Sequence, residues 1–131
     1  MEALWKCYEV AMKAALIFLS LLIGSLPAHT GEADVLEVDT FCDDQRSCGF
    51  SVTVRHDDEG WDHYADRWEV LTLDETVLGT RVLAHPHQKE QPFTRSLRNV
   101  RIPDDAKSVI IRAHDSVHGF GGLEVYVSIP D

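Results

Sequence analysis

The feature that most constrains the fold is a two-residue alternation of apolar and polar side chains, which recurs in short segments from about residue 35 onward. The alternation is clearest in residues 49–55, where polar residues separate three apolar ones: Phe50, Val52 and Val54. Because successive side chains of a strand point to opposite faces, this pattern predicts a strand with one face in the core.

Six further segments have strand character, and turn residues separate them at regular spacing. We expect seven strands, over residues 35–40, 49–55, 67–73, 77–84, 93–102, 109–113 and 123–129. Inward-facing side chains are predicted for the last two strands at Val109, Ile111, Ala113, Leu123, Val125, Val127 and Ile129. With Trp68 on the third strand and no helical periodicity after residue 33, the pattern predicts an all-β, immunoglobulin-like antiparallel β-sandwich of about seven strands. A small barrel is the alternative.

The beginning of the chain differs from the rest. Residues 14–23 are almost wholly apolar, a basic residue precedes them, and small residues follow. This run is too short for a membrane span and predicts a helical signal peptide over residues 1–33, with the sandwich domain over residues 34–131. Met12 is an alternative start, and Ala28 is an alternative to the preferred cleavage position, Ala33. We therefore expect a periplasmic or secreted protein with no membrane span after signal removal.

Two cysteines, Cys42 and Cys48, follow the predicted signal peptide. In an exported protein such a pair predicts a disulfide that closes a small loop, with free thiols as the alternative. Metal binding by both is less favoured, because structural zinc sites use shorter gaps between cysteines.

The chain is acidic, with 22 Asp and Glu against 12 Lys and Arg and a formal net charge of −10. This charge repels phosphate backbones and argues against nucleic-acid binding. It indicates either solubility or cation affinity, since several acidic residues stand beside histidines. The acidic run at residues 57–59 lacks the spacing of a calcium loop and predicts a solvated turn.

Six of the seven histidines fall in three predicted loops, residues 56–66, 85–92 and 114–122. Antiparallel strands alternate in direction, so alternate loops share one end of the domain. These three loops should lie at one end, and the turns near residues 43–47, 74 and 104 at the other. The alternation thus predicts a histidine-rich end.

This end is a candidate transition-metal site, because imidazole and carboxylate together suit zinc, iron or copper(II) better than calcium. The candidate ligands are His56, His63, His85, His87, His114, Asp115 and His118. The alternative for individual loop histidines, His56 and His85 above all, is a hydrogen bond to a main-chain carbonyl.

A second hypothesis is a non-catalytic binding or accessory module that recognises an envelope protein, a carbohydrate or another small ligand. Its candidate recognition residues are Trp61, Tyr64 and Phe120, although aromatic side chains also cap the open ends of small domains. Nucleophilic catalysis has little support, because no serine stands in a nucleophile elbow and no phosphate-binding glycine loop is present.

Residues 63–70, His-Tyr-Ala-Asp-Arg-Trp-Glu-Val, resemble the His-Tyr-Ile-x-Trp-Ile-Glu segment of superoxide reductases, the desulfoferrodoxin iron domain. Residues 115–119, Asp-Ser-Val-His-Gly, resemble that family's Cys-x-x-His-Gly before the final strand. The resemblance implies a mononuclear iron with His63 and His118 as ligands and His56 as a third. Asp115 stands where the family has its axial cysteine, and that thiolate tunes the iron. The resemblance therefore gives no basis for expecting superoxide reduction.

A weaker resemblance is to the sulfur-compound carrier subunit of periplasmic thiosulfate oxidation, a non-catalytic sandwich. It rests on His63-Tyr64, Gln91-Pro92-Phe93 and the final strand. Either resemblance covers about half of the chain.

Overall fold

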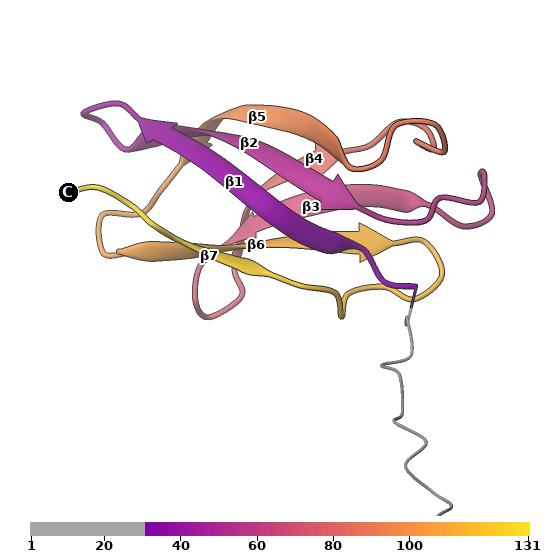
Figure 1. The fold of residues 1–131 in the computed structure, drawn as a ribbon. Helices are drawn as coiled ribbons and strands as arrows, with labels where there is room; N and C mark the ends of the chain where they lie inside the picture. The colour runs from indigo at the N-terminus through magenta and orange to yellow at the C-terminus, as the bar shows by residue number, and fades with distance from the viewer. Residues whose placement is uncertain (1–30) are drawn as a thin grey trace, which may run out of the picture.

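The computed structural model describes residues 31–131, which form two antiparallel sheets packed face to face (Figure 1). Most of the predicted signal peptide, residues 1–30, lies outside the described residues. The seven strands are β1 (Asp34–Cys42), β2 (Ser47–Arg55), β3 (Ala65–Leu71), β4 (Val77–Val82), β5 (Phe93–Arg101), β6 (Ser108–Asp115) and β7 (Val125–Ser128). The prediction of an all-β sandwich is confirmed.

One sheet has the strand order β1-β2-β5, and the other has the order β4-β3-β6-β7. All paired neighbours are antiparallel. The order follows the immunoglobulin scheme, in which the first, second and fifth strands face the third, sixth and seventh. The fourth strand differs from that scheme, because it joins the sheet of the third strand.

The core lies between the sheets and is made by the inward faces that the alternation predicts. Phe50, Val52 and Val54 of β2 are fully buried and face the fully buried Trp68 and Val70 of β3 across the sandwich. Burying such side chains is worth about 1.5–3 kcal/mol each, and this burial is the main force that holds the two sheets together.

The predicted inward face is confirmed for β6 but is wrong at one position near the end of the chain. Leu123 is 60% exposed, although it was expected to face inward. It precedes β7, and its main chain pairs with the start of β1: its amide donates to Asp34 Oδ1 at 2.8 Å and its carbonyl accepts from Val35 N at 2.9 Å. This pairing fixes the backbone in an orientation that the sequence alternation does not reveal.

The prediction of two loop sets is confirmed by the strand directions (Figure 1). The β2–β3, β4–β5 and β6–β7 loops lie at one end of the sandwich, which we call the histidine pole. The β1–β2, β3–β4 and β5–β6 turns lie at the opposite end. There the disulfide between Cys42 and Cys48 closes the β1–β2 hairpin.

Candidate metal centre

The β2–β3 loop carries the first two histidines of the site and is shaped by its own main chain. Glu59 N donates to the His63 carbonyl at 2.8 Å, and His63 N donates to the Gly60 carbonyl at 3.2 Å. Gly60 has a φ of 111°, a left-handed conformation that favours glycine. This tight turn brings His63 back beside His56, with ring centroids 4.9 Å apart.

The β6–β7 loop carries the third group, Asp115, at the end of β6. Asp115 and Gly119 exchange two main-chain hydrogen bonds of 2.9 Å, which close a short turn. Asp115 Oδ1 accepts the amides of Val117 and His118 at 2.6 Å each. This is the hydrogen-bonding habit of aspartate at a turn, and it holds the carboxylate rigidly.

The two loops meet at the other carboxylate oxygen, Asp115 Oδ2. His63 Nε2 lies 2.7 Å from this oxygen, and His56 Nε2 contacts it as well. Ligand atoms of His56, His63 and Asp115 all lie within 4.8 Å of one another, so the three could hold a metal ion. We call these three residues the Asp115 cluster. The side chains of Asp115 and His56 are fully buried, and that of His63 is 16% exposed.

A second carboxylate stands behind each histidine of the cluster. His56 Nδ1 lies 2.5 Å from Asp58 Oδ1, and His63 Nδ1 lies 3.5 Å from Glu59 Oε2. Both imidazoles therefore turn Nε2 toward Asp115 and Nδ1 toward an outer carboxylate. Histidines that bind metals almost always have this arrangement, because the outer hydrogen bond fixes the tautomer and the ring orientation.

Asp58 is the buried anchor of this outer layer. Besides His56, it accepts the Ala65 amide at 3.0 Å through Oδ1 and the His87 amide at 2.6 Å through Oδ2. The prediction that residues 57–59 form a solvated turn is wrong for Asp58, whose side chain is fully buried. The sequence signal for this contact is the spacing of His56 and Asp58, an aspartate two residues after a histidine.

Charge within the cluster shifts the pKa values of its members. Burial opposes protonation of His63, but the charge and hydrogen bond of Asp115 and the nearby Glu59 outweigh it and raise the pKa of His63. Burial raises the pKa of Asp115, but the amides of His118 and Val117 and the imidazoles of His56 and His63 outweigh it, so the net pKa is lowered. The site therefore favours an ionised Asp115 carboxylate beside positively charged groups, and this carboxylate would attract a metal cation in the same way.

His118 stands at the mouth of the cluster. Its ring centroid is 5.0 Å from that of His63, and its Nδ1 lies 3.3 Å from Asp115 Oδ1. The side chain is 38% exposed, which makes it the most accessible imidazole at this point. It is a candidate for a fourth ligand.

The other three predicted histidine ligands lie apart from the Asp115 cluster. His114 Nδ1 pairs with Asp66 Oδ1 at 2.6 Å, and its ring lies edge-on against Phe120. His85 and His87 form their own pair, with ring centroids 4.6 Å apart. Burial, with the positive charges of Arg95 and His85, lowers the pKa of His87.

The alternative predicted for His56 and His85, a bond to a main-chain carbonyl, is also present. His56 Nε2 lies 2.9 Å from the Gly31 carbonyl oxygen, and His85 Nδ1 lies 3.0 Å from the Pro86 carbonyl oxygen. For His56 this oxygen shares Nε2 with Asp115. For His85 the bond occupies Nδ1 and leaves Nε2 available.

The three predicted recognition aromatics make different ring contacts. Trp61 is 67% exposed and lies edge-on against Tyr64, with ring centroids 5.7 Å apart. Phe120 instead lies under the Arg112 guanidinium, 3.8 Å from its ring centroid.

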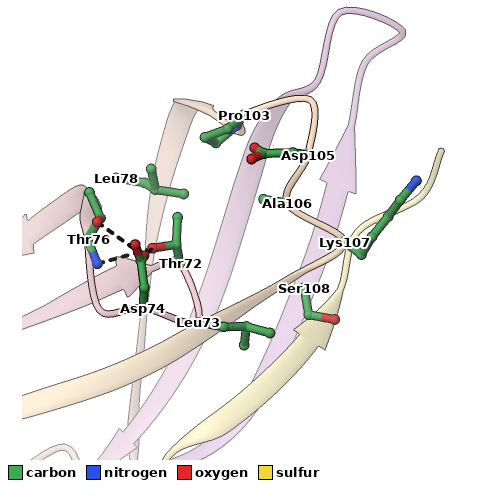
Figure 2. Close-up of a pocket in the computed structure, with 10 residues that line it drawn as sticks. All are labelled: Thr72, Leu73, Asp74, Thr76, Leu78, Pro103, Asp105, Ala106, Lys107 and Ser108. Atoms are coloured by element: carbon green, nitrogen blue, oxygen red, sulfur yellow. Dashed lines mark hydrogen bonds between the residues drawn. The ribbon is translucent and has the colours of Figure 1, made fainter.

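A pocket of about 530 Å³ lies at the pole opposite the histidines. It lies between the β3–β4 and β5–β6 turns and has no histidine in its lining (Figure 2). Asp74 in its wall accepts hydrogen bonds from Thr72 and Thr76 within its own turn. These bonds explain Asp74 as a turn-forming residue.

Fold and site together define a small β-sandwich with a buried cluster of histidines and carboxylates at one pole. The chain is 44% identical over 96 residues to a protein of Halomicrobium mukohataei named "Putative lipoprotein". The match covers 73% of this chain but 47% of the relative, so the chain spans about half the length of the protein it matches.

The sequence matches no protein-family model, and no solved structure matches it. These comparisons give no support to the resemblance to superoxide reductases or to the thiosulfate carrier subunit. No helix within residues 31–131 has the length and hydrophobicity needed to cross a membrane.

Proposed function

We propose that this protein is an exported β-sandwich module that binds one transition-metal ion at the Asp115 cluster. The observation that carries the proposal is the convergence of His56 Nε2 and His63 Nε2 on Asp115 Oδ2 from two loops more than 50 residues apart. Buried imidazoles and carboxylates at such distances need a cation or protons between them, because their lone pairs otherwise repel.

The outer carboxylates strengthen this argument. Both cluster histidines have a carboxylate at Nδ1 and face Asp115 with Nε2, as metal-binding histidines do. Their lone pairs at Nε2 would bind the ion once the protons have left, so binding should weaken as the solution becomes acidic.

The donor set favours a borderline divalent metal. Two imidazoles and one carboxylate suit Zn²⁺ and Fe²⁺, which such sets hold with one or more open positions. His118 would supply a fourth nitrogen at the mouth of the site. Because its ring is exposed, His118 would also be the first of these residues to contact an incoming ion.

Export is part of the proposal. The disulfide between Cys42 and Cys48 fits an oxidising compartment, and the relative named as a lipoprotein fits an envelope location. Ala33 is buried in the core, and the Gly31 carbonyl contacts His56. Signal cleavage after Ala28, which keeps these residues, therefore suits the fold better than cleavage after Ala33, and N-terminal sequencing of the mature protein distinguishes the two.

The test of metal binding uses protein purified without a histidine tag, stripped with a chelator and titrated with Zn²⁺ and, anaerobically, with Fe²⁺. We expect saturable binding that weakens at least tenfold in His63→Ala and in Asp115→Asn, because each change removes one ligand of the cluster. His118→Ala separates a four-ligand site, where binding weakens, from a three-ligand site, where it stays unchanged.

His114→Ala is the matched control, because it removes an imidazole at the same pole that lies outside the cluster. Circular dichroism of each variant checks that the sandwich is intact. If the wild type binds no ion more tightly than about 10 μM, or about −7 kcal/mol, or if His63→Ala binds as tightly as wild type, the proposal is wrong.

A second candidate function rests on Trp61. Its exposed ring, supported by Tyr64, stands on the same loop as His63 and is suited to contact a partner protein or a carbohydrate. Cross-linking in envelope extract, compared between wild type and Trp61→Ala, tests this role. Loss of a specific partner in the variant supports an accessory module, and an unchanged set of partners opposes it.

A further inference from the structure

The β4–β5 loop holds a pair of histidines that the Asp115 cluster does not use. His87 is buried, with 4% of its side chain exposed, and its ring stacks on Phe93 with centroids 4.0 Å apart. Within residues 31–131, neither ring nitrogen of His87 has a hydrogen-bond partner. Buried polar atoms are nearly always satisfied, so two such atoms on one ring need an explanation.

A pocket of about 320 Å³ lies at this ring. It is lined by residues 85–90 of the loop, which include both histidines and Glu90. Gln91 ties the loop to the domain, because its Nε2 donates to the His87 carbonyl at 3.1 Å and its Oε1 accepts the His56 amide at 3.0 Å. Gln91 therefore links the loop at His87 to the start of the β2–β3 loop.

From this geometry we propose a second metal site, in which His85 Nε2 and His87 Nε2 bind one divalent ion of the copper–zinc type in the pocket beside Glu90. His85 Nδ1 is already 3.0 Å from the Pro86 carbonyl oxygen, so its proton is fixed on Nδ1 and Nε2 keeps its lone pair. That is the outer contact expected of a metal-binding histidine. Two imidazoles suit copper(II) and zinc. The nearby Glu90 carboxylate is paired with Arg95 at 3.1 and 3.2 Å, so the two imidazoles carry the proposal.

The second site shares a carboxylate with the first. Asp58 Oδ1 holds His56 Nδ1, while Asp58 Oδ2 accepts the His87 amide and lies 4.0 Å from His87 Nδ1. In the loaded site, Nδ1 of His87 would donate toward Asp58, which leaves Nε2 for the ion. Asp58 would then orient one histidine of each site.

The test uses copper(II), whose electron paramagnetic resonance spectrum reports nitrogen ligands directly. The background is a chain with His63→Ala and Asp115→Asn, which removes the Asp115 cluster as a competing site. We expect this background to bind about one equivalent of copper(II) with a spectrum of nitrogen coordination. Adding His85→Ala should remove that equivalent, and so should His87→Phe, which keeps the stacking on Phe93.

Lys89→Ala is the matched control, because Lys89 lines the same pocket without an imidazole and its loss should leave binding intact. His85 is exposed, so His85→Ala should not disturb folding. The proposal is overturned if the background variant takes up no copper(II), or if its uptake persists in His85→Ala.

These outcomes are distinguishable from a failure of the first site. If only the second site exists, wild type binds one equivalent that His85→Ala removes and His63→Ala leaves in place. If only the first exists, the dependence is reversed.

Discussion

Replacing Asp58 should destabilise the fold and weaken the metal site together, because one buried carboxylate serves both. Its two oxygens accept from three buried donors, which are His56 Nδ1 and the amides of Ala65 and His87. Asp58→Ala leaves all three without a partner. Each buried donor that loses its partner costs about 1–3 kcal/mol, and breaking a buried charged contact costs about 3–5 kcal/mol in total.

We therefore expect Asp58→Ala to lower the free energy of unfolding by about 3–5 kcal/mol, a large part of the 5–15 kcal/mol typical of a domain. For a domain of this size, 1 kcal/mol corresponds to about 4–8 °C in Tm, so the Tm should fall by more than 10 °C. Asp58→Asn keeps one acceptor oxygen and should lose less stability. Since it removes the outer carboxylate from His56, it should still weaken metal binding by about 10–100-fold.

The assay is urea denaturation of stripped protein, followed by tryptophan fluorescence, together with zinc titration of the folded Asp58→Asn variant. Asp62→Asn is the control, since Asp62 lies in the same loop, is exposed, and loses the same charge. Asp62→Ala is the corresponding control for Asp58→Ala, and if Asp58→Ala is no less stable than Asp62→Ala, the reasoning about buried donors is wrong. If Asp58→Asn binds zinc like Asp62→Asn, the outer carboxylate has no role in the site.

Three further predictions follow from other parts of the structure. Replacing Cys42 and Cys48 together by alanine should lower the free energy of unfolding by about 2 kcal/mol, from the chain entropy of a short closed loop, and chemical denaturation measures this. Hydrogen bonds from Thr72 and Thr76 lower the pKa of Asp74 in the folded protein. The ionised Asp74 carboxylate therefore stabilises the fold above its unfolded pKa, and this stabilisation is lost as the pH falls through the folded pKa. Asp74→Asn should be less stable than wild type at pH 7 and equal to it in strong acid. A stability difference that grows on acidification would contradict this sign. Gly122→Ala should disrupt the start of β1, because a Cβ at residue 122 would lie 1.9 Å from the Ala33 carbonyl oxygen. Hydrogen exchange of the Val35 amide, which donates to the Leu123 carbonyl, should then become faster. Unchanged exchange at Val35 would contradict the clash.

Local pattern predicted the fold because burial in a sandwich is decided strand by strand. The alternation around Phe50 is enough to assign the inward face of β2, since the side chains of a strand must point to opposite sides. Strand direction then assigns each loop to a pole without any knowledge of contacts. The predicted inward orientation of Leu123 was wrong because this residue precedes β7 and follows a glycine-rich loop. Its main-chain conformation is set there by pairing with β1.

The sequence did not predict which of the candidate ligands at that pole come together in one site. Seven candidate ligands were predicted, and the structure groups His56, His63 and Asp115 while it places His114 against Asp66 and His85 beside His87. The selection depends on the side-chain directions of three loops, and these are fixed by contacts such as Tyr64 N to Ser116 Oγ at 3.0 Å.

By itself, then, the sequence determined a two-sheet β fold, its disulfide loop and the pole at which the histidines gather, because these follow from periodicity and chain direction. Only the tertiary structure decided that Asp58 is buried between two sets of imidazoles and that Asp115 lies under His56 and His63. Burial and separations of a few ångströms arise from packing between residues far apart in the chain, and local sequence does not encode them.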